Sequence, residues 1–427
     1  VIFMLIEFSV GNYLSFKDRQ TISLAASSIT EFPNNLIQQS GRQFLKGAAV
    51  FGGNASGKTN IIKAMAFVKN FFQNSYNISL LDRPIEVKPF LLNANNKNKP
   101  SFFELVFLAE ENIYRYGFEV DSNKVCSEWL FLTRVKSESK IFIRDGQNFS
   151  FGPKLSKSKI EPEKIRPNAL LLSRLALEGQ PIAEIILQWF KRFRIISSIN
   201  DESCHNFTSD QVNNNKVFKK KVLNFLRQAD FNVSDILIDT QSYQSLDNIP
   251  AQFKRVVEGI LPSKTDTFKA TFKSIAFTHD RYNESGQVVD TVNFDLENLE
   301  SAGTRKFFNL IGPIIDCLES GNVLVIDEID SQLHPELVNF IVKLFNSKKN
   351  KQQAQLIFNT HNIPLLNAGI LRRDQIWFVN KNYLGESSLY SLVDFISESG
   401  QKIRKDESFE KNYLAGRYGG LPYIKND

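Results

Sequence analysis

The sequence predicts an α/β fold, and two observations support this prediction. A short run of small and apolar residues, from Lys46 to Phe51, leads into a glycine-rich segment and then into a helical pattern. Four apolar residues, Val323 to Ile326, end in two carboxylates, within a last third of the chain that alternates strand and helix. Short apolar runs bounded by turn signals indicate buried strands, and their alternation with helices is typical of α/β proteins.

The glycine-rich segment fits the pattern G-x-x-x-x-G-K-[ST] of a phosphate-binding loop. Its glycines allow backbone N–H groups to curl around a phosphate, and the helix expected from Asn60 to Phe72 adds its positive N-terminus. We expect Lys58 to reach the β- and γ-phosphates of ATP and to act in catalysis, and the Thr59 hydroxyl to ligate Mg²⁺. The candidate nucleotide-binding residues are Gly52, Gly53, Asn54, Ala55, Ser56, Gly57, Lys58, Thr59 and Asn60.

Two acidic residues follow the second apolar run. We expect Asp327 to hold Mg²⁺, directly or through water, and Glu328 to orient or deprotonate the attacking water. An apolar strand that ends in acids can also be a strand that meets solvent. The phosphate-binding loop upstream favours the catalytic interpretation, so the two segments together predict ATP binding and hydrolysis.

Residues 300–304 lie just before a predicted helix and resemble the signature motif of ABC-type ATPases, Leu-Ser-Gly-Gly-Gln. Ser301 and Gly303 match the motif, whereas the other three positions depart from it. A serine hydroxyl, glycine N–H groups and a helix N-terminus can form a second phosphate cradle. The same residues also suit a helix N-cap, and the sequence leaves both interpretations open.

Two further segments occur in the order that this class of ATPase requires. Ile329 to Pro335 resembles the D-loop that crosses a dimer interface, and His334 within it is expected to be a D-loop or capping residue. Leu356 to Asn362 is a predicted strand that ends in His361, which resembles the switch histidine that contacts the γ-phosphate. In ABC-type ATPases the phosphate-binding loop of one subunit and the signature of another enclose one ATP. The resemblance therefore implies a head-to-tail homodimer that ATP holds together.

The predicted fold is thus a P-loop NTPase of ABC type, resembling a RecF or structural-maintenance head. Alternating segments within 85–144 predict an antiparallel β subdomain. Helical composition from Ala169 to Ser198 and from Lys216 to Ala229, with a polar loop at 206–215, predicts a helical, lid-like insertion. We expect three parts: 1–165 with the phosphate-binding loop and the β subdomain, 166–265 as the insertion, and 266–427 with the signature, the acidic pair and the switch histidine.

Composition and charge bound the class of protein. The chain has 427 residues, 42% of them hydrophobic, which is enough for a sizeable core. A net charge of +6 permits contact with nucleic acid without arguing for it. Cys126, Cys204 and Cys317 show no metal-ligand spacing and are typical of reduced thiols in the cytoplasm. No apolar run is long enough to predict a membrane-spanning helix, so we expect no membrane partner.

The order of the motifs, the first strand with its turn (6–16) and two C-terminal segments (371–378 and 413–422) resemble one family. It is the ABC-type AAA-like ATPases of bacterial abortive infection, the AbiL or RloA kind, related to the ATPases of OLD and PARIS anti-phage systems. The resemblance implies an ATPase that senses phage and controls a toxic effector. OLD proteins carry a Toprim nuclease domain after the ATPase, but only 66 residues follow His361. We therefore expect a separately encoded effector, such as a Toprim-like nuclease.

The main alternative is a RecF-like DNA repair ATPase, which shares the phosphate-binding loop, signature and switch histidine. The absence of a heptad run for coiled-coil arms, and the C-terminal segments, favour the abortive-infection family. A scaffold that does not hydrolyse ATP is a third reading, against which the intact Glu328 argues. The sequence offers no obvious glutamine at the place of the ABC-type Q-loop, so the residue that replaces it stays open.

Overall fold

The computed structural model describes residues 2–81, 83–134, 137–155, 161–197, 201–243, 270–396, 400 and 402–421. The chain forms two compact units, Val1–Asn200 with Asp316–Asp427, and Asp201–Ile315. The expected bounds of a helical insertion at 166–265 differ from these units at both ends. Residues 166–200 fold with the first unit, and the second unit extends through the signature segment.

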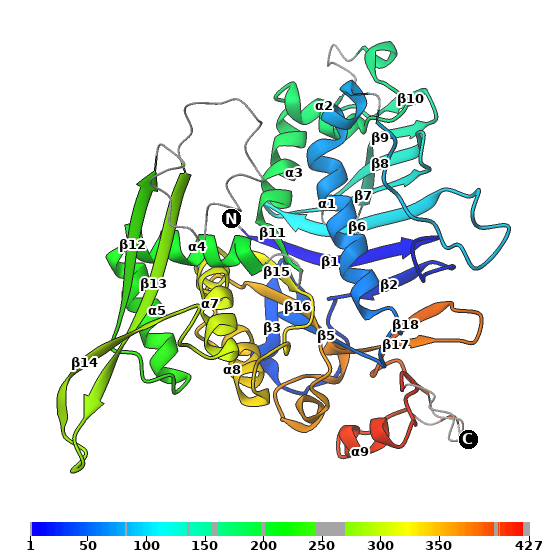
Figure 1. Cartoon of the computed structure of the whole chain (residues 1–427). Helices are drawn as coiled ribbons and strands as arrows, with labels where there is room; N and C mark the ends of the chain where they lie inside the picture. Colours follow the sequence, from blue (N-terminus) through cyan, green and yellow to red (C-terminus); the bar gives the residue numbers. More distant parts are fainter. Residues whose placement is uncertain are drawn as a thin grey trace. The chain divides into compact units, whose positions relative to one another are not determined.

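The first unit contains a seven-stranded antiparallel sheet in the order β10-β9-β8-β7-β6-β1-β2 (Figure 1). Its strands are β1 (Phe3–Gly11), β2 (Gln20–Ser23), β6 (Ser101–Ala109), β7 (Asn112–Val120), β8 (Val125–Arg134), β9 (Ser137–Asp145) and β10 (Asn148–Phe151). The predicted antiparallel β subdomain is therefore confirmed. The sheet extends beyond the predicted stretch 85–144, because the N-terminal strand β1 pairs with β6.

A six-stranded sheet in the order β11-β15-β16-β5-β17-β18 forms the other half of this unit. Its strands are β5 (Gly47–Phe51), β11 (Phe193–Ile196), β15 (Val323–Ile326), β16 (Gln355–Asn359), β17 (Ile376–Lys381) and β18 (Ser387–Ser391). The first five strands in the sheet run parallel, and β18 pairs antiparallel at one edge. The three central strands β5, β15 and β16 are buried throughout, as parallel strands covered on both faces are.

Three helices share one hydrophobic core with both sheets: α1 (Lys58–Leu80), α2 (Leu171–Leu177) and α3 (Pro181–Arg192). Phe72 of α1 stacks on Phe190 of α3 with ring centroids 4.2 Å apart. Trp189 of α3 lies with its ring centroid 4.4 Å from that of Phe107 in β6. The expectation that α2 and α3 belong to a separate insertion is wrong, because their apolar faces complete the core of the first unit.

Strand β11 corrects a second expectation. The stretch from Ala169 to Ser198 reads as helical throughout, yet α3 ends at Arg192 and the next four residues pair in parallel with β15. Periodicity cannot separate a four-residue apolar strand from the last turn of an apolar helix. The partner strand, more than 100 residues away in sequence, decides the conformation.

The second unit combines helices α4 (Asp201–Asn214) and α5 (Lys216–Gln228) with a three-stranded antiparallel sheet, β12-β13-β14. The strands are β12 (Asp235–Tyr243), β13 (Ala270–Tyr282) and β14 (Val288–Asp295), and helix α7 (Ala302–Ser320) begins in this unit. The prediction of a loop at 206–215 is wrong, because helix α4 continues through this segment to Asn214. Thr208 and Ser209 are buried there, and the Thr208 hydroxyl donates to the Asn309 carbonyl at 3.2 Å. A polar composition therefore hid a packed helix.

The remaining elements are short or peripheral. They are β3 (Leu36–Gln39), β4 (Arg42–Leu45), α8 (Pro335–Asn346), α9 (Phe409–Leu414) and 3-10 turns at Pro33–Asn35, Pro162–Lys164, Ile363–Asn367 and Arg373–Gln375. Within the described ranges, no helix combines the length and apolar content needed to cross a membrane.

Candidate nucleotide-binding site

Three adjacent strands bring the predicted site segments to one edge of the parallel sheet. In the sheet order, β16 lies between β15 and β5. The phosphate-binding loop follows β5, the acidic pair follows β15, and His361 lies two residues after β16. Because parallel strands end at the same edge, the three segments converge although they lie far apart in sequence.

The backbone of the phosphate-binding loop needs its glycines. Gly52 and Gly57 have φ of 155° and 113°, a region that residues with a Cβ rarely adopt. A Cβ on Gly57 would lie 2.5 Å from the Ser387 Oγ and 2.7 Å from the Ser15 Oγ. A Cβ on Gly52 would lie 2.5 Å from the Val379 carbonyl oxygen. The loop is therefore closely enclosed by the chain around it.

The ammonium group of Lys58 is buried against this loop. Its Nζ donates to the carbonyl oxygens of Gly52, at 2.6 Å, and of Gly53, at 3.0 Å. Burial lowers the pKa of Lys58 to about 8, while the negative charges of Asp330, Glu328 and Asp327 act in the opposite direction. A buried cation held only by carbonyl oxygens of a glycine loop is suited to exchange them for phosphate oxygens.

The acidic pair is held by a residue that the sequence interpretation missed. Asn359, the last residue of β16, donates from Nδ2 to the Asp327 Oδ1 at 2.5 Å. Its Oδ1 accepts from the Glu328 N–H. Glu328 has a left-handed φ of 52°, which is uncommon for a residue with a side chain. The signal available in the sequence was a polar residue directly after the apolar run Leu356 to Phe358.

The switch histidine and the D-loop segment are also joined. The His361 N–H donates to the Asp330 Oδ2 at 3.0 Å, and the His361 side chain is exposed. The other carboxylate oxygen of Asp330 is buried and has no hydrogen-bond partner among the residues that the structure describes. His334 caps α8, because its Nδ1 accepts from the Glu336 N–H at 3.3 Å, which confirms the expected capping role.

Two serines from outside the motif support the loop from behind. The Ser387 Oγ donates to the Ser56 carbonyl at 2.6 Å, and the Ser387 N–H donates to the Ser15 carbonyl at 2.8 Å. The Asn60 side chain donates to the Ser15 Oγ at 2.8 Å. Asn60 therefore anchors the first turn of α1 to the turn after β1, and its predicted role at the nucleotide stays a prediction.

The residues present fit Mg²⁺ together with ATP. Mg²⁺ in such sites keeps several waters and takes one or two protein oxygens plus phosphate oxygens. Thr59 in the first turn of α1 and Asp327 at the end of β15 would supply those protein oxygens. Among the described residues there is no cluster of three or more His, Cys, Asp or Glu side chains that could hold a metal by itself. Phosphate oxygens and waters would supply the remaining ligands.

Ser301 and Gly303 lie in the second unit, at the start of α7. The Ser301 Oγ accepts from the Thr304 N–H at 3.0 Å, so Ser301 acts as the helix N-cap. The preceding Glu300 pairs with the His279 Nε2 at 2.6 Å, although His279 carries no signal in the sequence. Ser301 is exposed. The capping interpretation is confirmed, and the interpretation as a phosphate cradle stays a prediction.

The C-terminal segment reaches the phosphate-binding loop. The Tyr413 hydroxyl donates to the Gly420 carbonyl at 3.1 Å, and the Tyr413 ring stacks on Phe378 of β17. A Cβ on Gly420 would lie 3.5 Å from the Gly52 Cα. The glycine-rich ending noted in the sequence thus packs beside the start of the loop; Pro422, its last residue, lies outside the described residues.

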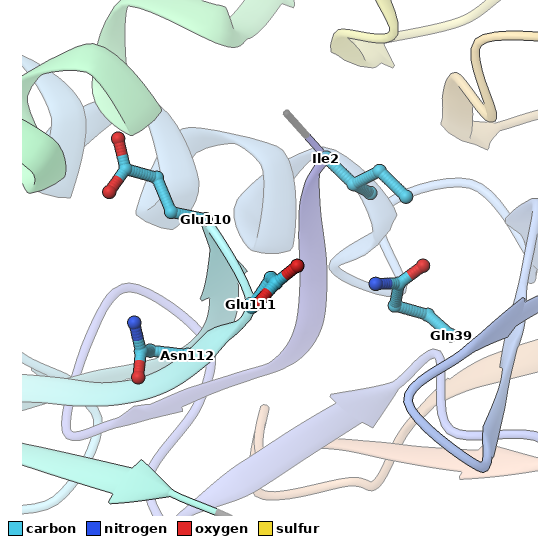
Figure 2. Close-up of a pocket in the computed structure, with 5 residues that line it drawn as sticks. All are labelled: Ile2, Gln39, Glu110, Glu111 and Asn112. Carbon is cyan, nitrogen blue, oxygen red and sulfur yellow. The ribbon is translucent and has the colours of Figure 1, made fainter.

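A separate pocket is lined by Ile2, Gln39, Glu110, Glu111 and Asn112 (Figure 2). These residues come from the start of β1, the end of β3 and the β6–β7 turn, where both glutamates have positive φ. None of them is a predicted site residue. A lining with two carboxylates and no cationic side chain does not suit a phosphate, so this pocket is not the nucleotide site.

Comparison with known proteins gives one sequence family. The family model described as "AAA domain, putative AbiEii toxin, Type IV TA system" matches residues 48–367. No curated protein matches the chain in sequence.

Among the solved structures similar to this chain are three SMC heads. The head domain of SMC from Thermotoga maritima has a TM-score of 0.38 and 14% identity, over 91% of this chain and 98% of that one. The SmcHead bound to the C-winged helix domain of ScpA has a TM-score of 0.36 and 15% identity, over 91% and 97%. The Smc head domain with an extended coiled coil bound to the C-terminal domain of ScpA, from Pyrococcus furiosus, has a TM-score of 0.35 and 14% identity, over 91% and 96%.

The family match spans most of the chain. It includes the phosphate-binding loop, the signature segment, the acidic pair and the switch histidine within a single stretch. The chain therefore belongs to the family of AAA-domain proteins described as putative AbiEii toxins of type IV toxin–antitoxin systems.

Proposed function

We propose that this protein is an ABC-type ATPase that binds ATP with Mg²⁺ and hydrolyses it to ADP and phosphate. One observation carries the proposal, which is the convergence of Lys58 with Asp327 and Glu328 at the end of the parallel sheet. The negative charges of Asp327, Glu328 and Asp330 all favour the protonated form of Lys58 and thus raise its pKa. A cation and carboxylates that converge beside a glycine loop suit phosphoryl transfer, in which catalysis rests on positioning and charge stabilisation.

Each residue has a defined task in this proposal. The loop N–H groups and Lys58 bind the β- and γ-phosphates. Thr59 and Asp327 would hold Mg²⁺, which supplies positive charge to the phosphate oxygens when bound. Glu328 accepts a proton from the attacking water and thereby orients it, and His361 contacts the γ-phosphate.

Ser301 and Gly303 of a second copy complete the site in this proposal. Ser301 is an exposed residue at the N-terminus of a 19-residue helix, a position that suits the γ-phosphate of an ATP held by another subunit. ATP then links two copies head to tail, and hydrolysis loosens them. The γ-phosphate makes the difference between the two states.

The family and the sequence resemblance support a biological role within this proposal. The family is described by a putative toxin of a type IV toxin–antitoxin system, which fits a protein of abortive infection. We propose that the ATPase controls a separately encoded effector, of which a Toprim-like nuclease is the expected kind. Expression with and without the neighbouring gene tests this point. Toxicity that needs both genes supports a sensor with an effector, and toxicity of this chain alone would make it the toxin itself.

ATP turnover tests the enzymatic proposal. Phosphate release is measured for the wild type, for Glu328→Gln and for Glu336→Gln, a control that changes an exposed carboxylate on α8 in the same way. We expect Glu328→Gln to lower kcat by about 100-fold or more, as loss of a general base does. The control should match the wild type. Equal and negligible turnover in all three proteins would contradict the proposal.

A further inference from the structure

The end of strand β16 contains a residue with a task that the motifs do not describe. Asn359 is fully buried and lies on the central strand of three, with β15 on one side and β5 on the other. The next residue, Thr360, donates from its N–H to the Val50 carbonyl at 3.1 Å. Asn359 is therefore fixed on a rigid element with its amide directed at the turn after β15.

This single amide contacts both acidic residues at once. Its Nδ2 donates to the Asp327 Oδ1 at 2.5 Å, and its Oδ1 accepts from the Glu328 N–H. The Asn359 backbone carbonyl also accepts from the Ile329 N–H at 3.3 Å. Three consecutive residues of the acidic turn are thus bound to one residue of the neighbouring strand.

Each contact has a separate consequence for the reaction. The donor to the Asp327 Oδ1 takes up one lone pair of that oxygen and fixes the rotation of the carboxylate, and Oδ2 lies outside this contact. The acceptor for the Glu328 N–H supports the left-handed backbone at Glu328, which in turn sets the direction of its side chain. Aspartate at this position would lack the donor, and an aliphatic side chain would lack both groups.

We propose that Asn359 is a positioning residue that sets both the Mg²⁺ ligand Asp327 and the general base Glu328. The inference rests on the proposed function of these two acids and goes beyond it, because it assigns their geometry to Asn359, a residue to which the sequence motifs give no role. Residues that orient metal ligands through hydrogen bonds typically change metal affinity or activity by about 10- to 100-fold when they are replaced. Phosphate binding by the loop and Lys58 does not pass through Asn359.

The test separates metal from nucleotide. The variant is Asn359→Leu, which keeps the approximate shape and removes both polar contacts. The matched control is Asn350→Leu, since Asn350 is also buried and its amide makes three hydrogen bonds, to Phe345 and Ala354. Asn350 precedes β16, at the opposite end of the strand from the acids. ATP affinity is measured with and without Mg²⁺, together with kcat, KM and the thermal midpoint.

We expect the Mg²⁺-free ATP affinity of Asn359→Leu to stay within about twofold of wild type, while the gain in affinity on adding Mg²⁺ and kcat both fall about 10-fold or more. Asn350→Leu should lose thermal stability without either change. Asn359→Ala is measured in the same way, as a second variant in case Asn359→Leu does not fold. We expect the same decrease in kcat and in the gain of ATP affinity on adding Mg²⁺. Wild-type values in the Asn359 variants, or losses no larger than those of Asn350→Leu, would overturn the inference alone. A wild-type protein that binds no ATP would overturn the proposed function and this inference with it.

Discussion

The Lys58 ammonium lies 2.6 Å from the carbonyl oxygen of Gly52, inside the loop that is expected to hold phosphate. Burial there lowers the pKa of Lys58 to about 8 from its usual 10.5. The group keeps its proton only up to about pH 8 in the folded protein, whereas the unfolded chain holds it up to about pH 10.5. The free energy of unfolding should therefore increase as the pH rises from the lower to the higher of these two values. Over the same pH range, Lys58 in the folded protein loses the positive charge that it needs to bind phosphate.

ATP binding should consequently weaken as the pH rises above about 8. The dissociation constant, measured from pH 7 to pH 9.5, should increase for the wild type because less of Lys58 is protonated. Lys58→Arg keeps its charge throughout this range, so its affinity, although lower, should not change with pH. A wild-type affinity that is flat up to pH 9.5 would show that Lys58 is not the titrating contact.

Gly57→Ala should abolish ATP binding. The added Cβ would meet two serine hydroxyls at 2.5 and 2.7 Å, in a backbone conformation with φ of 113°. Gly41→Ala is the control, because Gly41 also has positive φ, 74°, but its Cβ would meet nothing within 4 Å. Both changes cost about 1 kcal/mol of backbone strain, and only Gly57→Ala should affect nucleotide affinity. Unchanged affinity in Gly57→Ala would mean that the loop can open away from Ser15 and Ser387.

Glu128→Ala should destabilise the first unit strongly. Glu128 and Arg144 are both fully buried, and the Arg144 Nη1 lies 3.7 Å from the Glu128 Oε2. The Glu128 carboxylate also accepts hydrogen bonds from the N–H groups of Leu171 and Leu172 at the start of α2. Burial raises the pKa of Glu128 and lowers that of Arg144. Removing one partner leaves an uncompensated buried charge, which costs about 3–5 kcal/mol.

Chemical denaturation measures this loss. The control is Glu138→Ala, which breaks the half-exposed pair with Arg115 and should cost about 1 kcal/mol or less. Similar losses in the two variants would show that the buried pair does not anchor α2 to the antiparallel sheet.

The parts of the site that the sequence predicted are those with local signals. The phosphate-binding loop, the acidic pair and His361 each lie at the end of a short apolar strand, and the parallel sheet places these ends together. In the turn after β15, the sequence predicts the roles of the acidic residues Asp327 and Glu328 but not the residue that positions them. That residue, Asn359, could not be assigned, because the contact depends on two strands being neighbours, which periodicity does not encode.

The fold shows the same division. Strands β6 to β9 lie almost entirely within 85–144, the stretch that the sequence predicts as antiparallel strands. Strand β11 and helix α4 were missed for opposite reasons, since β11 is an apolar extension of a helix and α4 is polar in composition. In both segments tertiary contacts, with β15 and with Asn309 respectively, determine the conformation.

In the proposed mechanism, ATP joins two copies through the loop of one and Ser301 of the other. Glu328→Gln slows hydrolysis and should keep ATP bound, so its mass in solution is measured by light scattering with and without ATP and Mg²⁺. Ser301→Arg in the same background places a large cation at the predicted cradle and should still bind ATP. The mass should double with ATP for Glu328→Gln and should not double for the Ser301→Arg combination. If the mass stays that of one chain while ATP is demonstrably bound, ATP does not join two copies in this way.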